Sequence, residues 1–490
     1  MPPHARTLAA CTALAAALAV VPAAAQITQA EYAARRAGLI AHIDSGVVVA
    51  FGAREPIDHY PPFHQRAPFQ YLTGFLAPDA ALIIVKHGGQ VTQTLFVQPS
   101  NPRREFYTGT RVTPEAIRDE TGMSAARNDR LAPVLDSLAA TGLPFWAVND
   151  AEAAEFASDD SLSFGAVTVR NLKTTHPALD LHDATPTLDS LRARKSPAEI
   201  ALLKKAADIS TLGHRAAPQA IGPGRNEYEV QALMEYTFRK NGGGRPAYSS
   251  IVGSGPNSTT LHYDLDERVM KAGEVIVMDV ATSYQGYAAD ITRTLPVSGT
   301  FSPDQRAIYQ LVRDAQAAGE RQVRPGVSYK VELDSIRAVV AHGLARLGLI
   351  DSVGATVDAP AGFCGKATVC PQLSLFMPHG PSHGLGLDVH DLAHFYNQPQ
   401  QLFATGDAFT IEPGIYIRPG IVDILPDTPG NRAFIARVRP LLQRYANIGV
   451  RIEDDYVVTE QGVERLSLAP RELSEIEAMM KKQRVAAAGQ

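Results

Sequence analysis

The stretch GEVIVMDVATSYQGYAADITRT, residues Gly273–Thr294, carries the clearest fold signal in the chain. Val275–Val280 has the apolar pattern of a buried strand, yet it contains Asp279, and carboxylates are uncommon in such strands. Asp290 follows 11 residues later inside a second strand-like run, with turn-forming residues between the two runs. A hairpin would place the two carboxylates side by side. Since two buried anions repel each other unless a cation joins them, the pattern favours a metal site over a hydrogen-bonded core pair.

Two later strand patterns are also interrupted by an acid. FTIEPGIYI (Phe409–Ile417) contains Glu412, and GVRIEDDYVV (Gly449–Val458) contains Glu453. Glu412 does not fit the outward face of a half-exposed strand, because Phe409, Ile411, Ile415 and Ile417 leave no consistent polar face. Arg451 beside Glu453 fits an ordinary ion pair and alone indicates little.

A histidine cluster lies between these patterns, in FMPHGPSHGLGLDVHDLAHF (Phe376–Phe395). It holds His379, His383, His390 and His394, and it fits either a metal and catalytic site or a chance run in a surface loop. A helical H-E-x-x-H zinc motif is excluded, since Gly-Pro follows His379 and no Glu does. Carboxylates with one imidazole suit a pair of divalent ions such as manganese, cobalt or zinc. Such pairs share a bridging hydroxide in some aminopeptidases.

Composition describes an ordinary globular protein. The 490 residues suffice for two to three domains, and 45% are hydrophobic and 20% charged. The net charge is -5 and no dense basic stretch occurs, which argues against nucleic acid as a partner.

The N-terminus predicts export. Residues 1–25 combine a basic start, an apolar run and small residues before a cut at Gln26, as in a secretory signal peptide. No later segment reaches about 18 uninterrupted apolar residues, so no membrane span is expected. The mature protein would be secreted or periplasmic. Its two remaining cysteines, Cys364 and Cys370, predict a small disulfide loop.

Two domains are expected after the signal peptide, spanning residues 26–188 and 189–490. Gly46–Phe51 and Ala80–Val85 look like buried strands of the first, and Lys173–Thr187 is rich in turn formers and predicts a linker. SPAEIALLKKAADIS then opens the second domain, because Ser196 begins an N-terminal capping box.

Taken in order, these motifs resemble the creatinase/aminopeptidase P/prolidase family of metallopeptidases. The N-terminal domain carries FQYLTGF (Phe69–Phe75), which is similar to a stretch of the family's N-terminal domain. The resemblance implies an α/β (α+β) fold, a creatinase-like α/β domain followed by a "pita-bread" catalytic domain. The other motifs that carry it are LHY (Leu261–Tyr263), GYAADITRT with Asp290, HGPSHGLGLDVHD (His379–Asp391), IEPGIY with Glu412, and GVRIEDD with Glu453.

The resemblance also implies a role for each site residue. Five would hold two metal ions, with Glu412 also moving a proton: Asp279, Asp290, His383, Glu412 and Glu453. His262, His379 and His390 would line the substrate site and Arg451 would support it, whereas no role follows for His394. A metal-bridged hydroxide would then release an N-terminal residue that precedes proline, and a dimer or tetramer is expected.

Alternatives within and outside catalysis remain open at this point. A prolidase, which cuts only Xaa-Pro dipeptides, is the nearest, and Arg418, Arg432 and Arg437 are its candidates for binding the free carboxylate. A metal-free creatinase-type hydrolase and a non-catalytic binding homologue are disfavoured because all five ligand positions are filled.

Overall fold

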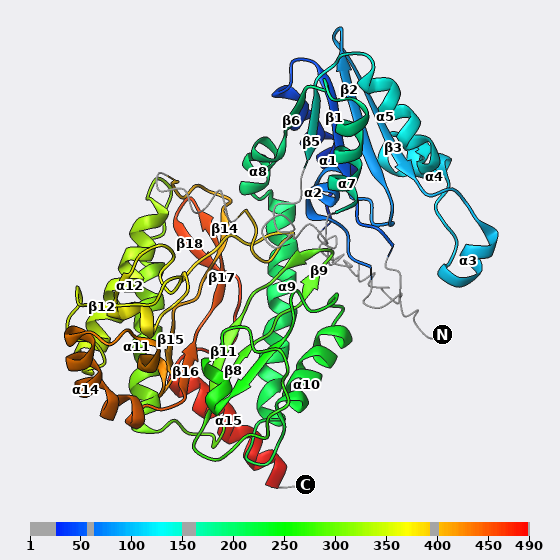
Figure 1. Cartoon of the computed structure of the whole chain (residues 1–490). Coiled ribbons are helices and arrows are strands. Elements are labelled where there is room, and N and C mark those ends of the chain that lie inside the picture. Colours follow the sequence, from blue (N-terminus) through cyan, green and yellow to red (C-terminus); the bar gives the residue numbers. More distant parts are fainter. Residues whose placement is uncertain (1–25, 56–62, 149–162, 393–400, 489–490) are drawn as a thin grey trace, which may run out of the picture.

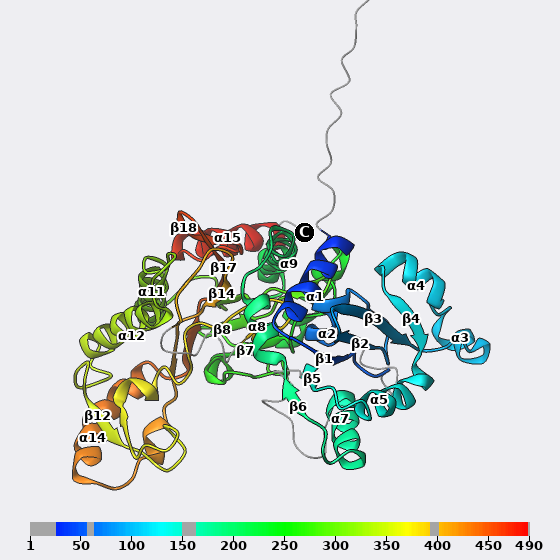
Figure 2. The ribbon, with the colours of Figure 1, turned by 90° about the horizontal axis from the view of Figure 1, so that it is seen from above.

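The computed structural model describes residues 26–55, 63–148, 163–392 and 401–488, which form two lobes joined by α8 and α9 (Figures 1 and 2). The expected signal peptide, residues 1–25, and His394 lie outside the described residues. Within the part of the chain that is described, no helix is both long enough and apolar enough to cross a membrane.

The N-terminal lobe is built on a mixed six-stranded sheet of order β4-β3-β2-β1-β5-β6. Three of its neighbouring pairs, β3 with β4, β1 with β5 and β5 with β6, are parallel, and the others are antiparallel. The strands are β1 (Gly46–Phe51), β2 (Ala81–His87), β3 (Gln90–Val97), β4 (Ser124–Arg127), β5 (Phe145–Val148) and β6 (Leu181–Asp183).

Helices cover both faces of this sheet. Alternate residues of β1 divide between two cores: Val48 and Ala50 pack toward α1, α2 and α8, whereas Val47 and Val49 pack toward α5 and α7. The period of two explains why β1 reads as an unbroken apolar run. The helices are α1 (Gln29–Ala41), α2 (Ala67–Thr73), α3 (Pro102–Thr108), α4 (Pro114–Thr121), α5 (Leu131–Ala139), α7 (Phe164–Thr175) and α8 (Thr185–Ala193).

The prediction of a linker at Lys173–Thr187 was wrong. The segment contains the end of α7, the edge strand β6 and the start of α8. Its turn formers serve as caps and connections instead, because the side chain of Asp183 accepts a hydrogen bond from the backbone of Thr185 at the start of α8 (2.8 Å). The lobes are therefore joined by a packed connection.

The C-terminal lobe contains short antiparallel strands between two helical layers. In Figure 1 the strands β8, β11, β14 and β17 lie between α9 and α10 on one side and α11 and α12 on the other. The main strands form three groups, β11-β8-β7, β14-β17-β18 and β15-β16. The strands are β7 (Ile251–Ser254), β8 (Val275–Asp279), β9 (Ser283–Tyr284), β10 (Tyr287–Ala288), β11 (Thr292–Pro296), β12 (Thr356–Asp358), β13 (Val369–Pro371), β14 (Ala408–Ile411), β15 (Gly414–Ile417), β16 (Ile448–Arg451), β17 (Asp454–Thr459) and β18 (Gly462–Arg465).

Long helices give this lobe its outer layers. The capping box predicted at Ser196 is present and begins α9. The helices are α9 (Pro197–Ala216), α10 (Glu227–Lys240), α11 (Pro303–Glu320), α12 (Tyr329–Arg346), α14 (Pro429–Arg444) and α15 (Leu473–Ala488). Short 3-10 turns are η1 (Asn128–Arg130), η3 (Ala217–Gln219), η4 (Gly255–Thr259), η5 (Gln372–Leu375) and η6 (Ile421–Ile424).

The predicted hairpin is present, with one correction. β8 pairs antiparallel with β11, and Thr292 lies opposite Asp279. Asp290 was predicted to lie inside a strand, but it lies in the break between β10 and β11. The predicted disulfide also forms, between Cys370 in β13 and Cys364 in the loop that precedes this strand.

Candidate active site

The nine residues for which the sequence predicts a role in the site line one cavity of the C-terminal lobe, with a volume of about 410 Å³. The structure thus brings together segments almost 200 residues apart. The nine are His262, Asp279, Asp290, His379, His383, His390, Glu412, Arg451 and Glu453.

The four carboxylates come from the ends of strands. Asp279 is the last residue of β8, and Glu412 directly follows β14. Glu453 directly precedes β17, and Asp290 precedes β11 by two residues. Where a ladder ends, the alternation of side chains also ends, so an acid can turn away from the apolar core without breaking the strand pattern. This accounts for acids inside otherwise apolar sequence runs.

His383 lies at the centre of this group. Its Nε2 is 3.4 Å from Asp290 Oδ2, 3.4 Å from Glu412 Oε1 and 3.8 Å from Glu453 Oε1. Ligand atoms of Asp290, His383 and Glu453 all fall within 4.8 Å of one another. Asp279, at the end of β8, is the fourth acid of the group. Tyr248 donates a hydrogen bond to its Oδ1 (2.5 Å).

The carboxylates are buried without enough positive charge. Burial, followed by the charges of Asp290, Glu412 and Asp279, raises the pKa of Glu453 well above its usual range. Burial and the charge of Asp279 likewise raise the pKa of Asp290. Burial raises the pKa of Glu412 to about 7, although His383 and Arg451 act in the opposite direction. The group as a whole therefore favours an added cation.

His383 fits such a cation as a ligand. Its Nδ1 donates to the carbonyl of Gly384 (3.0 Å), which leaves Nε2 directed at the acids. Burial opposes its charged form, but Asp290 and Glu412 outweigh burial and raise its pKa to about 9. A proton on His383 therefore partly neutralises the acids. Asp290 Oδ1 is buried without a hydrogen-bond partner, so the donor set of carboxylates and one imidazole fits divalent ions.

A chain of hydrogen bonds connects the remaining predicted residues. Arg451 donates to Asp279 Oδ2 (2.5 Å) and to the hydroxyl of Tyr416 (2.8 Å). That hydroxyl lies 2.9 Å from His379 Nε2, while His379 Nδ1 donates to the Gly380 carbonyl (2.7 Å). Burial and the charge of Arg451 lower the pKa of His379 to about 4, so its ring is neutral at pH 7.

His262 and His390 are different, because both are exposed to solvent while lining the cavity. The ring of His390 stands edge-on to that of His383, with centroids 4.5 Å apart. These two histidines therefore offer imidazoles to a molecule that enters the cavity.

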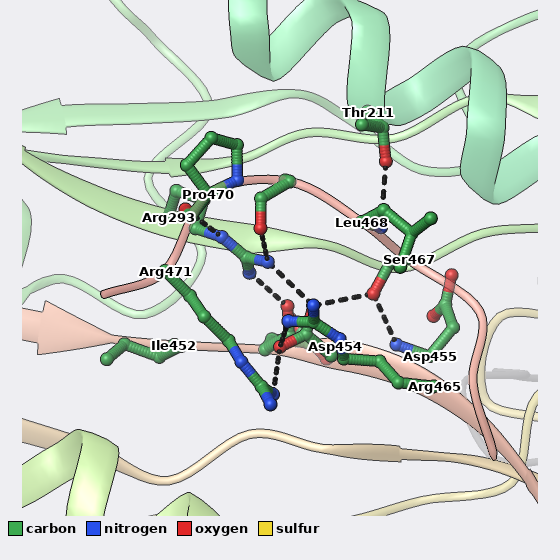
Figure 3. Close-up of polar contacts among 12 residues, drawn as sticks. Thr211, Arg293, Ile452, Asp454, Asp455, Arg465, Ser467, Leu468, Pro470 and Arg471 are labelled. Atoms are coloured by element: carbon green, nitrogen blue, oxygen red, sulfur yellow. Dashed lines mark hydrogen bonds and ion pairs between the residues drawn. The ribbon is translucent and has the colours of Figure 1, made fainter. Parts of the chain in front are cut away.

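A second charge cluster is centred on the buried Asp454, the first residue of β17 and the direct neighbour of Glu453 in the chain. Figure 3 shows three guanidinium groups converging on Asp454. Arg293 donates to its Oδ1 (2.6 Å), Arg471 donates to its Oδ2 (2.9 Å), and Arg465 lies 3.7 Å from Oδ2. Ser467 adds a hydroxyl donor (2.6 Å). The charge of Asp454 is therefore balanced by arginines of the protein itself.

This second cluster holds the backbone that carries two of the predicted ligands. Arg293 also donates to the carbonyl of Glu453 (2.6 Å), and Asp455 accepts the backbone N–H of Asp290 (3.0 Å). Fixing these backbone atoms fixes where the two ligand side chains start.

Sequence reasoning missed three residues that touch the predicted site. Thr292 donates its hydroxyl to Glu453 Oε2 (2.6 Å) and accepts from Arg451 Nε (3.1 Å). Thr292 and Tyr416 stand inside motifs that were recognised, next to the acids, so their position was a usable signal. Tyr248 had none, because its contact with Asp279 depends on a loop packing against β8.

Comparisons with known proteins agree with this geometry. The sequence profile of metallopeptidase family M24 matches residues 201–460, and that of the aminopeptidase P N-terminal domain matches residues 32–142. The chain is 31% identical to Xaa-Pro aminopeptidase of Escherichia coli K12 over 467 residues, covering 93% of this chain and 98% of that protein. It is 33% identical to Xaa-Pro aminopeptidase of Haemophilus influenzae, covering 86% and 89%.

Solved structures show the same likeness in three dimensions. Aminopeptidase P of Escherichia coli with the inhibitor Pro-Leu superposes with a TM-score of 0.78 at 29% identity, covering 94% of this chain and all of that one. Aminopeptidase PepP of Pseudomonas aeruginosa gives 0.77 at 29% identity, covering 94% and 99%.

Proposed function

The chain belongs to metallopeptidase family M24, and from that premise we propose that it is a Xaa-Pro aminopeptidase. The observation that carries the proposal is the convergence of four acids, three of them buried and Glu412 partly buried, and His383 in one cavity of a chain similar along its length to Xaa-Pro aminopeptidases. Its substrates would be peptides with proline at the second position.

The ligand set would hold two divalent ions. Asp279, Asp290, His383, Glu412 and Glu453 would be the ligands, and we propose manganese as the native metal, with cobalt or zinc as substitutes. When bound, such ions lower the pKa of a shared water, so that hydroxide is available near neutral pH.

The side chains around that centre would handle the proton and the substrate. Glu412 Oε2 lies 3.6 Å from His379 Nδ1, and a carboxylate in this cavity can take a proton and return it to the leaving nitrogen. His390 and His262 face the cavity, where an imidazole N–H can donate a hydrogen bond to the carbonyl oxygen as charge develops on it. A bond before proline has no N–H to grip, so recognition must come from these groups and from the shape of the cavity.

A peptide-length series tests the proposal against its nearest alternative, a dipeptidase. We expect Xaa-Pro-Yaa tripeptides and longer peptides to lose their first residue at rates comparable to or above Xaa-Pro, and N-acetylated peptides to be left intact. Mass spectrometry of the digests gives the readout. Cleavage confined to dipeptides would assign the chain to the prolidases. Metal analysis of the purified protein would separate both from a metal-free hydrolase or a binding homologue.

We also propose that the protein is exported as a secreted or periplasmic enzyme and assembles into a dimer or tetramer. The signal-like residues 1–25 and the Cys364–Cys370 disulfide support export, because disulfides persist in oxidising compartments. N-terminal sequencing of the mature protein should begin at or near Gln26, and light scattering would give the number of subunits.

A further inference from the structure

A buried ion cluster lies where the two lobes meet and contacts the loop that carries His390. Arg192, near the end of α8, donates to Asp388 Oδ2 (2.7 Å) and to Asp391 Oδ1 (2.6 Å). Lys195, in the connection to α9, donates to Asp391 Oδ2 (2.7 Å) and to the Arg192 carbonyl (2.9 Å). Two cations from the junction thus hold two anions of the loop (Figure 2 shows α8 and α9 between the lobes).

Three of the four charged residues in this cluster are almost completely buried. Arg192 is 3% exposed, Lys195 5% and Asp391 1%. Withdrawing such ions from water costs about as much as their attraction returns, so buried ion clusters add little net stability and are better explained by the geometry they specify.

Backbone hydrogen bonds within residues 384–391 also fix the loop that these ions hold. The backbone N–H of Asp391 donates to the Gly384 carbonyl (2.9 Å), and that of Gly386 donates to the Asp388 carbonyl (3.0 Å). A Cβ on Gly386 would lie only 2.0 Å from Asp391 Oδ2, so a side chain there would force the carboxylate away. The loop conformation and the ion cluster therefore depend on each other.

His390 lies between the two anchored acids and has no anchor of its own. Within the described part of the chain its ring contacts the ring of His383, and no hydrogen bond to the His390 ring is found there. The direction of this imidazole must come from its backbone, which Asp388 and Asp391 hold on either side.

We propose that Arg192 and Lys195 are positioning residues that hold the His390 imidazole over the metal centre, which makes the lobe junction part of the catalytic apparatus. The inference rests on the proposed function, since it is there that His390 contacts the substrate. A cluster that served only to join the lobes would instead leave His390 unaffected when it is disrupted.

Two variants disturb the loop by different routes. Lys195→Met keeps the aliphatic stem and removes the ammonium, and Gly386→Ala keeps every charge but displaces Asp391, so it serves also if Lys195→Met does not fold. Arg35→Met is the matched control, because Arg35 is a buried arginine (7% exposed) that pairs with Glu199 across the same junction (3.3 Å) without touching the loop. Lys195→Arg should restore part of what Lys195→Met loses.

The first readout is hydrogen exchange of peptides covering residues 384–391 in the full mature chain. We expect exchange about tenfold faster or more in Lys195→Met and Gly386→Ala, and unchanged there in Arg35→Met. Unchanged exchange of the loop in the first two variants would overturn the proposal. This readout needs no substrate, so it stands even if the protein cleaves no Xaa-Pro peptide, a result that would instead refute the proposed function.

The second readout is a double-mutant cycle with His390→Ala, using kcat/KM for a Xaa-Pro-Yaa peptide. Lys195→Met should lower kcat/KM about tenfold or more in the wild-type background, and less than about twofold when His390 is already absent. An equal loss in both backgrounds would mean that Lys195 acts through stability alone, and the proposal would fail. If the residual activity of His390→Ala is too low to measure, the exchange result decides by itself.

Discussion

Glu453 and Asp454 are neighbours in the chain and almost fully buried (1% and 0% exposed), yet their surroundings are opposite. Glu453 faces other acids, which together with burial raise its pKa well above the usual range. Burial alone would also raise the pKa of Asp454, but Arg293, Arg471 and Arg465 outweigh burial and bring it to about 2.

The difference teaches where each cluster obtains its positive charge. Asp454 is neutralised by arginines that are part of the fold, so its cluster is complete as soon as the chain folds. Glu453 and its three acidic partners have Arg451 beside them, which pairs with Asp279, and the remaining negative charge is balanced only by a proton on His383 or by added ions. Two consecutive residues thus belong to different clusters, Asp454 to a permanent structural one and Glu453 to a conditional, functional one.

The largest expected effect comes from Asp290→Asn, which removes one charge from the conditional cluster. Replacing groups that merely support a metal ligand costs about 10–100-fold in affinity or activity, so losing a ligand charge should cost more than about 100-fold in kcat/KM. The fold should persist, because a repelled carboxylate has been neutralised. Kinetics and thermal unfolding after chelation and re-addition of manganese give the two readouts.

Turnover near the wild-type value in Asp290→Asn, after thorough chelation and reloading, would show that this carboxylate is not a ligand. A loss of folding instead of activity would place Asp290 with the structural cluster, and the proposed division between the two clusters would fail.

The next effect concerns stability, in a matched pair of neighbours. Asp454→Asn leaves three guanidinium groups around an uncharged amide, and breaking a buried ion cluster in this way costs about 3–5 kcal/mol of the free energy of unfolding. Glu453→Gln in the metal-free protein should change it by less than about 1 kcal/mol, because burial and the neighbouring acids raise the pKa of Glu453 and already disfavour its charged form. Urea denaturation of the chelated variants at pH 7 compares the two, and equal losses would contradict the assignment.

These two neighbours also mark how far sequence reasoning reaches. The acids of the ligand group were found because each interrupts an apolar strand and belongs to an ordered set of motifs. The structural cluster was not found, because Arg293, Arg465 and Arg471 come from separate segments and meet Asp454 only in three dimensions. Local patterns predicted strands and found acids that meet in one cavity, whereas partners brought in by tertiary packing leave no local pattern.

The same limit explains the error at Lys173–Thr187. Turn formers there indicated a linker, and three residues of β6 are too few for a strand pattern to be recognised. The strand exists because β5 offers a parallel edge, a tertiary cause that the segment itself does not encode. Arg192 and Lys195 lie just after this segment, at the end of α8 and before α9. Their contacts with Asp388 and Asp391 are likewise tertiary and leave no local pattern in the sequence.

The two clusters should also respond to pH with opposite sign. In the metal-free protein the pKa of Glu412 is raised to about 7, so its contribution is full below the unfolded pKa near 4.5 and is lost as pH rises to about 7, by about 3 kcal/mol. The pKa of Asp454 is lowered to about 2, so its contribution is present above about pH 4 and is lost as pH falls toward 2.

Unfolding free energies of chelated wild type and Glu412→Gln, compared from pH 4.5 to 8, isolate the first contribution. The difference between the two proteins should shrink or change sign as pH rises, and added manganese should reverse the trend for wild type. A difference that stays constant across this range would mean that Glu412 is not held in its neutral form by the cluster.

The smallest effect is expected at Arg432, which shows what an arginine contributes outside both clusters. Its Nη1 lies 2.7 Å from Asp427 Oδ1, as close as the buried pairs, but the two side chains are 58% and 81% exposed. Because water and salt screen such a pair, Arg432→Ala should change the free energy of unfolding by less than about 1 kcal/mol. Since the partner of Arg432 is a surface aspartate, KM for Xaa-Pro dipeptides and for tripeptides should also stay within about twofold of wild type. A rise in KM confined to dipeptides would instead give this arginine the carboxylate-binding role of a dipeptidase, and it would show that a charge far from either cluster takes part in recognition.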